Sequence, residues 1–449
     1  MDPDAVGSLQ FGSEGFGRGG GMPIMEQEIA TRRRQAAGDA GTHPAGGARD
    51  EHHFSIGFQE ASMSPDRPVF VTHSADGRKA ALPPPDPEAL ALSQDLSASI
   101  AAEIKAQGGA IPFRRYMELV LYAPGLGYYV AGQQRFGSGG DFITAPEMGS
   151  LFGATLARAV APLRGSDGVL EFGAGSGALA AQLLAALPPT PYAILEVSPD
   201  LAERQRQRLA GLPVRWLSAL PECWRGVVLA NEVLDAIPPH LVELDQDGVL
   251  WELGVALGPE GFVWRHLPAS DALQERLAPY LPHWPRPYRS EVNLAAEAWL
   301  RDVAEHLECG AILIIDYGHG AAEYYHPQRS MGTLRAYYRQ HWLEDPFYLP
   351  GLCDLTAHLD FDALQRVAVA AGLQVRSYDP LARFLIVNGL AEVFSAASGS
   401  ADPLTRMQLA NEAKRLTLPQ EMGESFKVLI LSKESPCKSP STASKTATP

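Results

Sequence analysis

The feature that most constrains the fold is an apolar segment followed by closely spaced glycines. Residues 169–179 read VLEFGAGSGAL, in which Gly173, Gly175 and Gly177 follow a short apolar run that contains Glu171. Glycine permits a sharp turn and the close approach of a ligand to the backbone, and the alanine- and leucine-rich residues beyond it predict a helix. A strand, a tight turn and a helix start leave backbone N–H groups facing a ligand, as in nucleotide-binding α/β folds.

A second apolar segment, YAILEV at 192–197, carries Glu196 near its end. This acid lies about 20 residues beyond the glycine-rich turn, where nucleotide-binding folds place the carboxylate that accepts hydrogen bonds from ribose hydroxyls. The two segments together predict a nucleoside-cofactor site at the carboxyl ends of neighbouring parallel strands.

Two kinds of cofactor fit the glycine spacing. Gly173, Gly175 and Ala178 satisfy the dinucleotide pattern G-x-G-x-x-G/A, so NAD and FAD remain alternatives at this point. Glu171 stands just before the first glycine, where its charge would repel a pyrophosphate and favour the ammonium and sulfonium groups of S-adenosylmethionine. The sequence therefore favours S-adenosylmethionine. Its predicted contacts in this region are Glu171, Gly173, Gly175, Gly177 and Glu196.

Two further segments agree with a methyltransferase sheet. Residues 227–238, VVLANEVLDAIP, place an apolar strand before a polar tip of Asn231 and Glu232, with Asp235 just beyond. Rossmann-like methyltransferases have substrate-facing polar residues at that tip. Near the C-terminal end, FKVLIL at 426–431 is an apolar run that suits a late strand inserted antiparallel into the sheet.

Several segments outside the glycine-rich turn resemble the MidA-like methyltransferases, whose mitochondrial members are complex I assembly factors that methylate a protein arginine. The matching segments are FRRYMELVLYAPGLGYYV (113–130), FGSGGDFITAPEMGSLFG (136–153), LANEVLDAIP (229–238), RPYRSEVNLAAEAWL (286–300), IIDYGHG (314–320), GTLRAYYRQH (332–341) and PGLCDLTAHLDF (350–361). They occur in order over residues 95–432. The resemblance implies a class I S-adenosylmethionine-dependent methyltransferase acting on a protein side chain, with an arginine guanidinium as the suggested acceptor.

The resemblance also implies cofactor contacts from a segment that precedes the glycine-rich turn. In related proteins the segment FGSGGDFITAPE lies just before the cofactor strand, so Asp141, Thr144 and Glu147 are expected to contact the cofactor or the substrate. Thr144 and Glu147 also fit a T-x-x-E capping box, with Pro146 inside the first turn of a helix. The tyrosines of the preceding segment, Tyr122 and Tyr129 among them, are expected to pack as a lid, with direct stacking on the substrate as the alternative.

A guanidinium acceptor needs carboxylates, which align its planar fork and polarise a group whose pKa is above about 12. Glu232 and Asp235 are three positions apart near the tip of the third strand and are the preferred catalytic pair. Glu291 is a further candidate, and Asn231 could orient a neutral acceptor through its amide oxygen. The structural alternative is that Asp235 caps a helix that follows the strand.

For several residues farther along the chain we predict structural roles. Asp316, in the segment IIDYG, is expected to support loop geometry, and Tyr317 to close over the site. Asp354 and His358, in DLTAHLDF, are explained by capping of the following helix. His358 and Asp360 have a metal-ligand spacing without a matching partner set, so no metal is predicted.

The predicted fold class is α/β, a Rossmann-like sheet with an N-terminal helical and loop region. The expected divisions are a disordered extension (1–85), a helical and lid region (86–165), the methyltransferase domain (166–434) and a disordered tail (435–449). Within the domain, insertions are expected at 240–285, as antiparallel strands, at 319–358, as loops, and at 380–422, as helices. A helix is predicted over 291–307. Crossovers through helices imply a mostly parallel sheet with the ligand at the carboxyl ends of its strands.

Charge and composition restrict the partners. The chain carries 52 acidic and 37 basic residues, a net charge of −15, which argues against nucleic acid and is compatible with a basic protein segment. Its four cysteines are far apart, without a C-x-x-C pair. No apolar run reaches the roughly 18 residues of a membrane span, and the acidic start is unlike a signal peptide or presequence. A bacterial cytoplasm is expected, and the oligomeric state is not indicated.

Three classes of function follow. An S-adenosylmethionine-dependent protein methyltransferase comes first, and an oxidoreductase dependent on NAD(P) or FAD is the alternative. A non-catalytic assembly factor that retains the cofactor fold is the third class. Its sign would be the loss of the glycines or of the acid on the second strand, and this chain keeps both.

Overall fold

The computed structural model describes residues 82–131 and 144–434, all within one compact unit. Asp141 and nearly all of the two predicted disordered ends lie outside the described residues. The expectations for these parts of the chain remain predictions.

The central sheet has the strand order β15-β16-β10-β5-β2-β3-β4, and β14 pairs with β10. Its strands are β2 (Gly168–Phe172), β3 (Tyr192–Leu195), β4 (Val214–Leu217), β5 (Trp224–Asn231), β10 (Leu307–His319), β14 (Leu359–Asp360), β15 (Gln374–Pro380) and β16 (Phe426–Lys433). The strands from β4 to β10 pair in parallel, whereas β16 runs antiparallel to both of its neighbours. This order confirms the predicted Rossmann-like sheet, and β16 is the expected late antiparallel strand.

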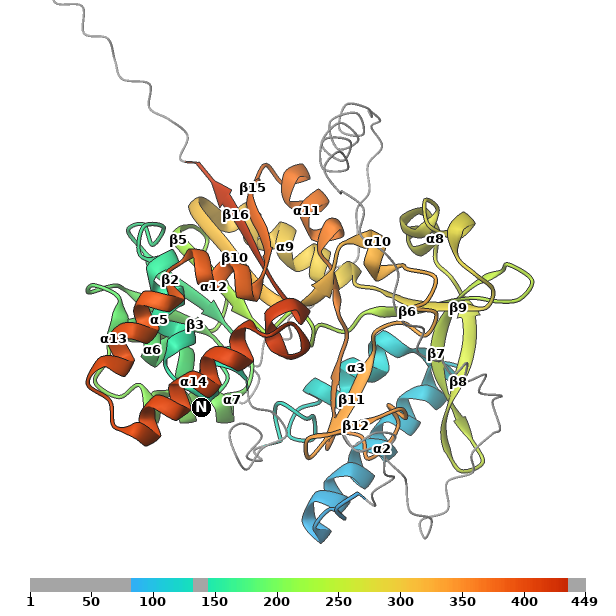
Figure 1. Ribbon diagram of the computed structural model, residues 1–449. Helices are drawn as coiled ribbons and strands as arrows, with labels where there is room; N and C mark the ends of the chain where they lie inside the picture. The colour runs from blue at the N-terminus through green and yellow to red at the C-terminus, as the bar shows by residue number, and fades with distance from the viewer. Residues whose placement is uncertain (1–81, 132–143, 435–449) are drawn as a thin grey trace, which may run out of the picture. The chain divides into compact units, whose positions relative to one another are not determined.

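Alternating apolar residues bury both faces of this sheet. In β5, Val227 and Leu229 belong to one core, while Val228 and Ala230 belong to the other. The first face packs against α5 (Leu151–Val160), α6 (Ala178–Ala186), α12 (Leu381–Val387), α13 (Leu390–Gly399) and α14 (Pro403–Thr417). The second face packs against α9 (Leu294–His306) and α11 (Phe361–Ala370). Helices thus cover both sides of a mostly parallel sheet (Figure 1), as parallel strands require.

A row of glycines crosses the central strands at the edge opposite the predicted site. Gly226 of β5 is in register with Gly168 of β2 and with Gly310 of β10. A Cβ at Gly226 would lie 2.3 Å from the carbonyl oxygen of Gly168, and a Cβ at Gly310 would lie 2.0 Å from that of Gly226. Side chains are therefore excluded here by neighbouring backbone, which allows the strands to start close together.

A second sheet is entirely antiparallel. Its order is β1-β7-β6-β9, and β8 pairs with β7. The strands are β1 (Ala110–Pro112), β6 (His240–Leu244), β7 (Leu250–Gly258), β8 (Gly261–Pro268) and β9 (Tyr288–Val292). The hairpins between 240 and 268 match the predicted strands, whereas β1 and β9 were not anticipated. The α2 (Pro87–Ala106) and α3 (Phe113–Tyr122) helices share a core with this sheet.

The helix predicted from residue 291 begins later. Ser290 to Val292 pair with β6, and the Asn293 side chain accepts a hydrogen bond from Ala296 N at 2.9 Å, so that α9 starts at Leu294. The prediction missed the strand because the apolar spacing of α9 continues smoothly backwards into it. A short α8 (Asp271–Leu277) lies between β8 and β9.

The predicted loop-rich insertion contains a small sheet of its own. It has the order β12-β11-β13, built from β11 (Arg335–Tyr338), β12 (His341–Leu343) and β13 (Asp354–Thr356), and it follows the short α10 (Ala321–Tyr324). Within the described ranges no single helix combines the length and apolar character needed to cross a membrane. The α12 and α13 helices pass that test jointly, with a bend of 68° between them.

The glycine row gives a stability prediction. Gly226→Ala places a methyl group against the backbone oxygens of Gly168 and Arg164, at 2.3 and 2.7 Å, so we expect a loss of about 1–3 kcal/mol in unfolding free energy. Gly399→Ala is the control, because no atom lies within 4 Å of its Cβ position at the end of α13; that variant should be neutral or slightly more stable. Thermal and denaturant unfolding measure both, and equal stability of the two variants would show that the strands can separate without cost.

Candidate active site

The glycine-rich turn joins β2 to α6 in a conformation that glycine alone adopts readily. Gly173, Gly175 and Gly177 have φ values of +54°, +54° and +80°, in the left-handed region. A Cβ at Gly173 would lie 3.3 Å from a methyl carbon of Val233. The turn therefore packs against the loop that follows β5, and two regions predicted from separate segments lie side by side.

Glu196 follows β3 and is connected to the same turn. Its Oε1 atom accepts a hydrogen bond from Ser198 N at 3.0 Å, and its Oε2 atom accepts one from Gln205 Nε2 at 2.8 Å. The Gln205 amide also donates to the carbonyl oxygen of Gly175 at 2.9 Å. Burial raises the pKa of Glu196, while these donors favour its ionised form. The structure thus brings Gly175 and Glu196, two predicted cofactor contacts, to one place.

Glu171 lies within β2 and is only 2 % exposed. Its carboxylate accepts a hydrogen bond from the Tyr192 hydroxyl at 2.8 Å. Burial, together with the charge of Glu196, raises the pKa of Glu171 to about 7. The Glu171 carboxylate thus binds a residue of the neighbouring strand β3. Its direct contact with the cofactor stays a prediction.

The capping box predicted for Thr144 and Glu147 is wrong. Thr144 precedes α4 (Ala145–Met148), but its side chain accepts no hydrogen bond from that helix. Glu147 instead hydrogen-bonds the hydroxyl of Ser176 in the glycine-rich turn and pairs with Arg208 at 3.1 Å. A cation and a hydroxyl displace the capping contact, and they tie α4 to the turn. The expected cofactor or substrate contacts of Thr144 and Glu147 stay predictions.

The loop after β5 is held by a buried acid of β10. Asp316 is fully buried, and its Oδ2 atom accepts hydrogen bonds from Leu234 N and Asp235 N at 3.0 and 3.2 Å. Its Oδ1 atom accepts one from Tyr317 N at 2.8 Å. Burial, opposed by these donors, raises the pKa of Asp316 to about 7. Asp316 thereby sets the position of Asp235, whereas the Glu232 N–H is held by Ile315 O at 2.9 Å.

Glu232 and Asp235 lie close enough to influence each other. Burial first, and then the charge of Asp316, raise the pKa of Glu232 to about 8. Asp235 is 5 % exposed, and burial together with the charges of Asp316, Asp354 and Glu232 raises its pKa well above the usual range. Residues 224–244, from β5 to β6, are all described, and no helix occurs between these two strands. The capping alternative for Asp235 is therefore wrong.

Asn231, at the end of β5, has an unsatisfied amide oxygen. Its Nδ2 atom donates to Glu232 Oε1 at 3.3 Å, whereas its Oδ1 atom is buried without a hydrogen-bond partner among the described residues. A buried acceptor without a donor is costly. The Asn231 Oδ1 atom is therefore an acceptor at the tip of β5 with which a ligand N–H or O–H group is compatible.

Asp354 of β13 was not among the predicted site residues, yet it belongs to this acid cluster. It is 4 % exposed and accepts a hydrogen bond from the Tyr129 hydroxyl at 3.0 Å. Tyr129 stacks on Tyr122 with ring centroids 5.6 Å apart, and the Tyr122 hydroxyl donates to Ala236 O at 3.0 Å. We refer to Glu232, Asp235, Asp316 and Asp354 as the acid cluster.

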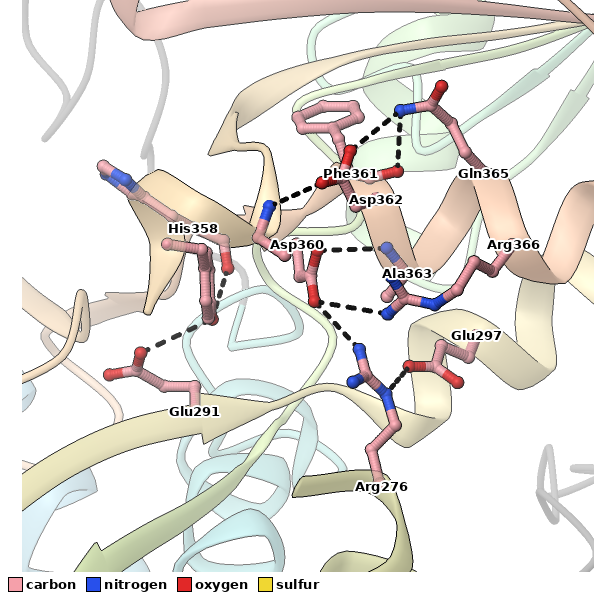
Figure 2. A network of polar contacts seen from close by, with 12 residues as sticks. Arg276, Glu291, Glu297, His358, Asp360, Phe361, Asp362, Ala363, Gln365 and Arg366 are labelled. Carbon is pink, nitrogen blue, oxygen red and sulfur yellow. Dashed lines mark hydrogen bonds and ion pairs between the residues drawn. The ribbon is translucent and has the colours of Figure 1, made fainter. Parts of the chain in front are cut away.

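The helix-capping interpretation of Asp354 is also wrong, because Asp360 caps α11 by accepting a hydrogen bond from Ala363 N at 3.0 Å. Figure 2 shows Asp360 in this role and also paired with Arg276 at 2.8 Å. The sequence signal that could have identified Asp354 is an acid within a short apolar strand, combined with a tyrosine-rich segment that needed a polar partner.

Glu291 has a different set of contacts from the acid cluster. It is 2 % exposed on β9 and accepts hydrogen bonds from Thr333 N and Leu334 N at 2.8 and 2.9 Å. The Thr333 hydroxyl and the Tyr324 hydroxyl lie 3.0 and 3.4 Å from its other oxygen. The Glu291 carboxylate thus holds the segment that leads into β11.

Comparison with known proteins identifies the family. Residues 156–379 match a family described as "Putative S-adenosyl-L-methionine-dependent methyltransferase". The mitochondrial protein arginine methyltransferase NDUFAF7 of Danio rerio is 30% identical in an alignment 387 residues long, which covers 75% of this chain and 86% of that protein. The chain belongs to the MidA-like family of S-adenosylmethionine-dependent methyltransferases. The Drosophila melanogaster homolog is likewise 30% identical, over 78% of this chain and 88% of its own length.

A solved structure of the family has the same fold. The crystal structure of a "likely methyl transferase" from Burkholderia thailandensis bound to S-adenosyl-homocysteine has a TM-score of 0.74 and 44% identity. It covers 79% of this chain and 95% of its own. These findings confirm the predicted methyltransferase fold, activity class and S-adenosylmethionine cofactor, in place of the dinucleotide alternative.

The contacts of Glu291 in this methyltransferase predict a structural role. Glu291→Ala leaves the N–H groups of Thr333 and Leu334 without their acceptor, and we expect a loss of about 2–4 kcal/mol in unfolding free energy. Glu291→Gln keeps a carbonyl oxygen at the same place, so it should retain stability and methyl transfer. Thermal unfolding and turnover of both variants test this. A Gln variant that folds and binds S-adenosylhomocysteine but transfers no methyl group would return Glu291 to the catalytic residues.

Proposed function

We propose that this methyltransferase transfers the methyl group of S-adenosylmethionine to an arginine side chain of a protein substrate. The observation that carries the proposal is the acid cluster, whose members come from the β5 loop, β10 and β13 and lie against the loop that packs on the glycine-rich turn. The curated relatives in Danio rerio and Drosophila melanogaster are named protein arginine methyltransferases.

The residues around the turn fit the cofactor. The left-handed glycines leave the backbone of the turn open to the amino-acid and ribose part of the ligand. Glu196 would accept hydrogen bonds from ribose hydroxyls, since a carboxylate has about four acceptor positions. S-adenosylmethionine brings an already activated methyl group, so the protein's task is to bring the acceptor nitrogen into line and to exclude water.

The acid cluster matches the chemistry of a guanidinium. That group has five N–H donors and no acceptor, so carboxylates and the open Asn231 Oδ1 atom are complementary to it. Several buried acids in one place raise one another's pKa, and a bound cation relieves that repulsion. The net charge of −15 also suits a basic protein segment.

The proton released on methylation needs an acceptor at the site. Methylation of a guanidinium that stays cationic liberates one proton, and Glu232 is the preferred group to take it. Its pKa of about 8 lies near neutral pH, where a general base is most effective. Asp235 and Asp354 would hold the remaining N–H groups and keep the fork in one orientation.

The acceptor is tested by labelling. We expect labelled S-adenosylmethionine, incubated with the enzyme and extract of its host, to label a protein, and mass spectrometry to locate the label on an arginine nitrogen. A Glu232→Gln enzyme added at the same concentration is the control for background transfer. Label on lysine, glutamine or a small molecule would refute arginine as the acceptor.

The role of Glu232 predicts the pH dependence of turnover. Because the ionised carboxylate is required and its pKa is raised to about 8, kcat/KM should fall as the pH falls through that value. A bound sulfonium favours the ionised form of Glu232. The fall of kcat under saturating cofactor should therefore occur at a lower pH than the fall of kcat/KM.

Glu232→Gln should reduce methyl transfer by roughly 10²-fold or more and remove the fall of kcat/KM at low pH. Its affinity for S-adenosylhomocysteine, measured by calorimetry, should be unchanged. A Gln variant that keeps both turnover and this pH dependence would remove Glu232 from the mechanism.

A further inference from the structure

A buried glutamine of α7 (Pro199–Arg208) connects three parts of the cofactor site. Gln205 is fully buried. Its Nε2 atom donates to Gly175 O at 2.9 Å and to Glu196 Oε2 at 2.8 Å, and its Oε1 atom accepts from Trp216 Nε1 at 2.9 Å. One amide therefore joins the glycine-rich turn, the acid after β3 and the strand β4.

These three partners determine the orientation of the amide. The indole N–H of Trp216 can only donate, so the Gln205 oxygen must face it and both amide hydrogens must face Gly175 and Glu196. The Arg206 guanidinium lies over the Trp216 ring, 5.4 Å from its centroid, and covers the far side of this contact. The arrangement has one orientation that satisfies every group.

The Glu196 carboxylate is consequently held at both oxygens. Ser198 N binds Oε1 and Gln205 Nε2 binds Oε2, so rotation of the carboxylate would break a charge-assisted hydrogen bond on either side. A group held in its binding orientation before the ligand arrives loses less freedom on binding. Gln205 also couples this orientation to the glycine-rich turn, because the same nitrogen binds Gly175 O.

We infer that Gln205 is a positioning residue that sets the Glu196 carboxylate for recognition of the cofactor's ribose hydroxyls. The inference rests on the ribose contact of Glu196 given under the proposed function, and it does not depend on the identity of the methyl acceptor. The competing role is a purely structural one, in which Gln205 supports the packing of α7 against β4 and affects every ligand equally.

The two roles differ in how the protein discriminates between ribose and deoxyribose. The probes are S-adenosylhomocysteine and its 2′-deoxy and 3′-deoxy analogues, measured by calorimetry on the full-length protein. Because a hydrogen bond to a charged group contributes about 1.5–3 kcal/mol, the wild-type protein should prefer the parent compound by roughly tenfold or more over each analogue.

Methionine has a similar volume to glutamine and no hydrogen-bonding amide. Gln205→Met should therefore weaken the binding of S-adenosylhomocysteine more than the binding of its deoxy analogues, so that the preference for the parent compound falls several-fold. Gln207→Met is the matched control, since Gln207 lies on the exposed side of α7, where its amide donates to Glu203 Oε1 at 3.2 Å; it should leave the preference unchanged. In a Glu196→Gln background, Gln205→Met should alter the preference no further, because the two residues act as one unit.

Trp216→Phe provides a second route should Gln205→Met fail to fold. It removes the indole donor that orients the amide but keeps the Gln205 nitrogen, so the preference should fall to an intermediate value. An equal loss of affinity for all three ligands in Gln205→Met, or in Trp216→Phe where only that variant folds, overturns the inference. Equal binding of the three ligands by the wild-type protein would overturn the ribose contact of Glu196 and the inference with it, while leaving arginine methylation to its own test.

Discussion

The arrangement of the site depends on one buried carboxylate, Asp316. Its oxygens accept hydrogen bonds from the backbone N–H groups of Leu234, Asp235 and Tyr317, so the loop after β5 has a single position relative to β10. That position places Val233 against the glycine-rich turn. A parallel pair of strands ends with unpaired backbone groups, and here an acid satisfies them without the helix that usually follows. A side chain, and not a helix, therefore completes the strand ends at the site.

The acid cluster is a local instability that a cation relieves. Burial and mutual repulsion raise the pKa values of Glu232, Asp235 and Asp316, and retaining such acids in a core is unfavourable without a partner. A sulfonium cofactor, and under the proposed function a guanidinium bound beside it, would supply these acids with cationic partners. The same electrostatics explain why a pyrophosphate-bearing cofactor is a poor match for this sheet edge.

Sequence reasoning recovered the parts of the fold that short-range patterns encode. The glycine-rich turn, the alternating strands and the late β16 strand each carry a local signal, and the parallel sheet follows from helical crossovers. Gln205 carries no such signal, and the signal of Asp354, an acid within a short apolar strand, does not show which distant segment it faces. Asp354 meets Asp235 only because the 350–357 segment returns to the β5 loop, where Ala357 N donates to Asp235 O at 3.0 Å. Strand β1, of three residues, was missed for the same reason, since it pairs with the distant β7, whereas β9 was missed because the apolar spacing of α9 continues into it.

Glu232 shows why a conformational cost can identify a functional position. Its φ is +54°, a left-handed value that costs a non-glycine residue roughly 1–2 kcal/mol. A glycine would adopt it freely, and three glycines do so in the adjacent turn. The backbone of Glu232 is held there because its N–H donates to Ile315 O at 2.9 Å, extending the pairing of β5 with β10. An acid at a place where glycine would be more stable indicates that the carboxylate, and not the loop geometry, determines the residue at this position.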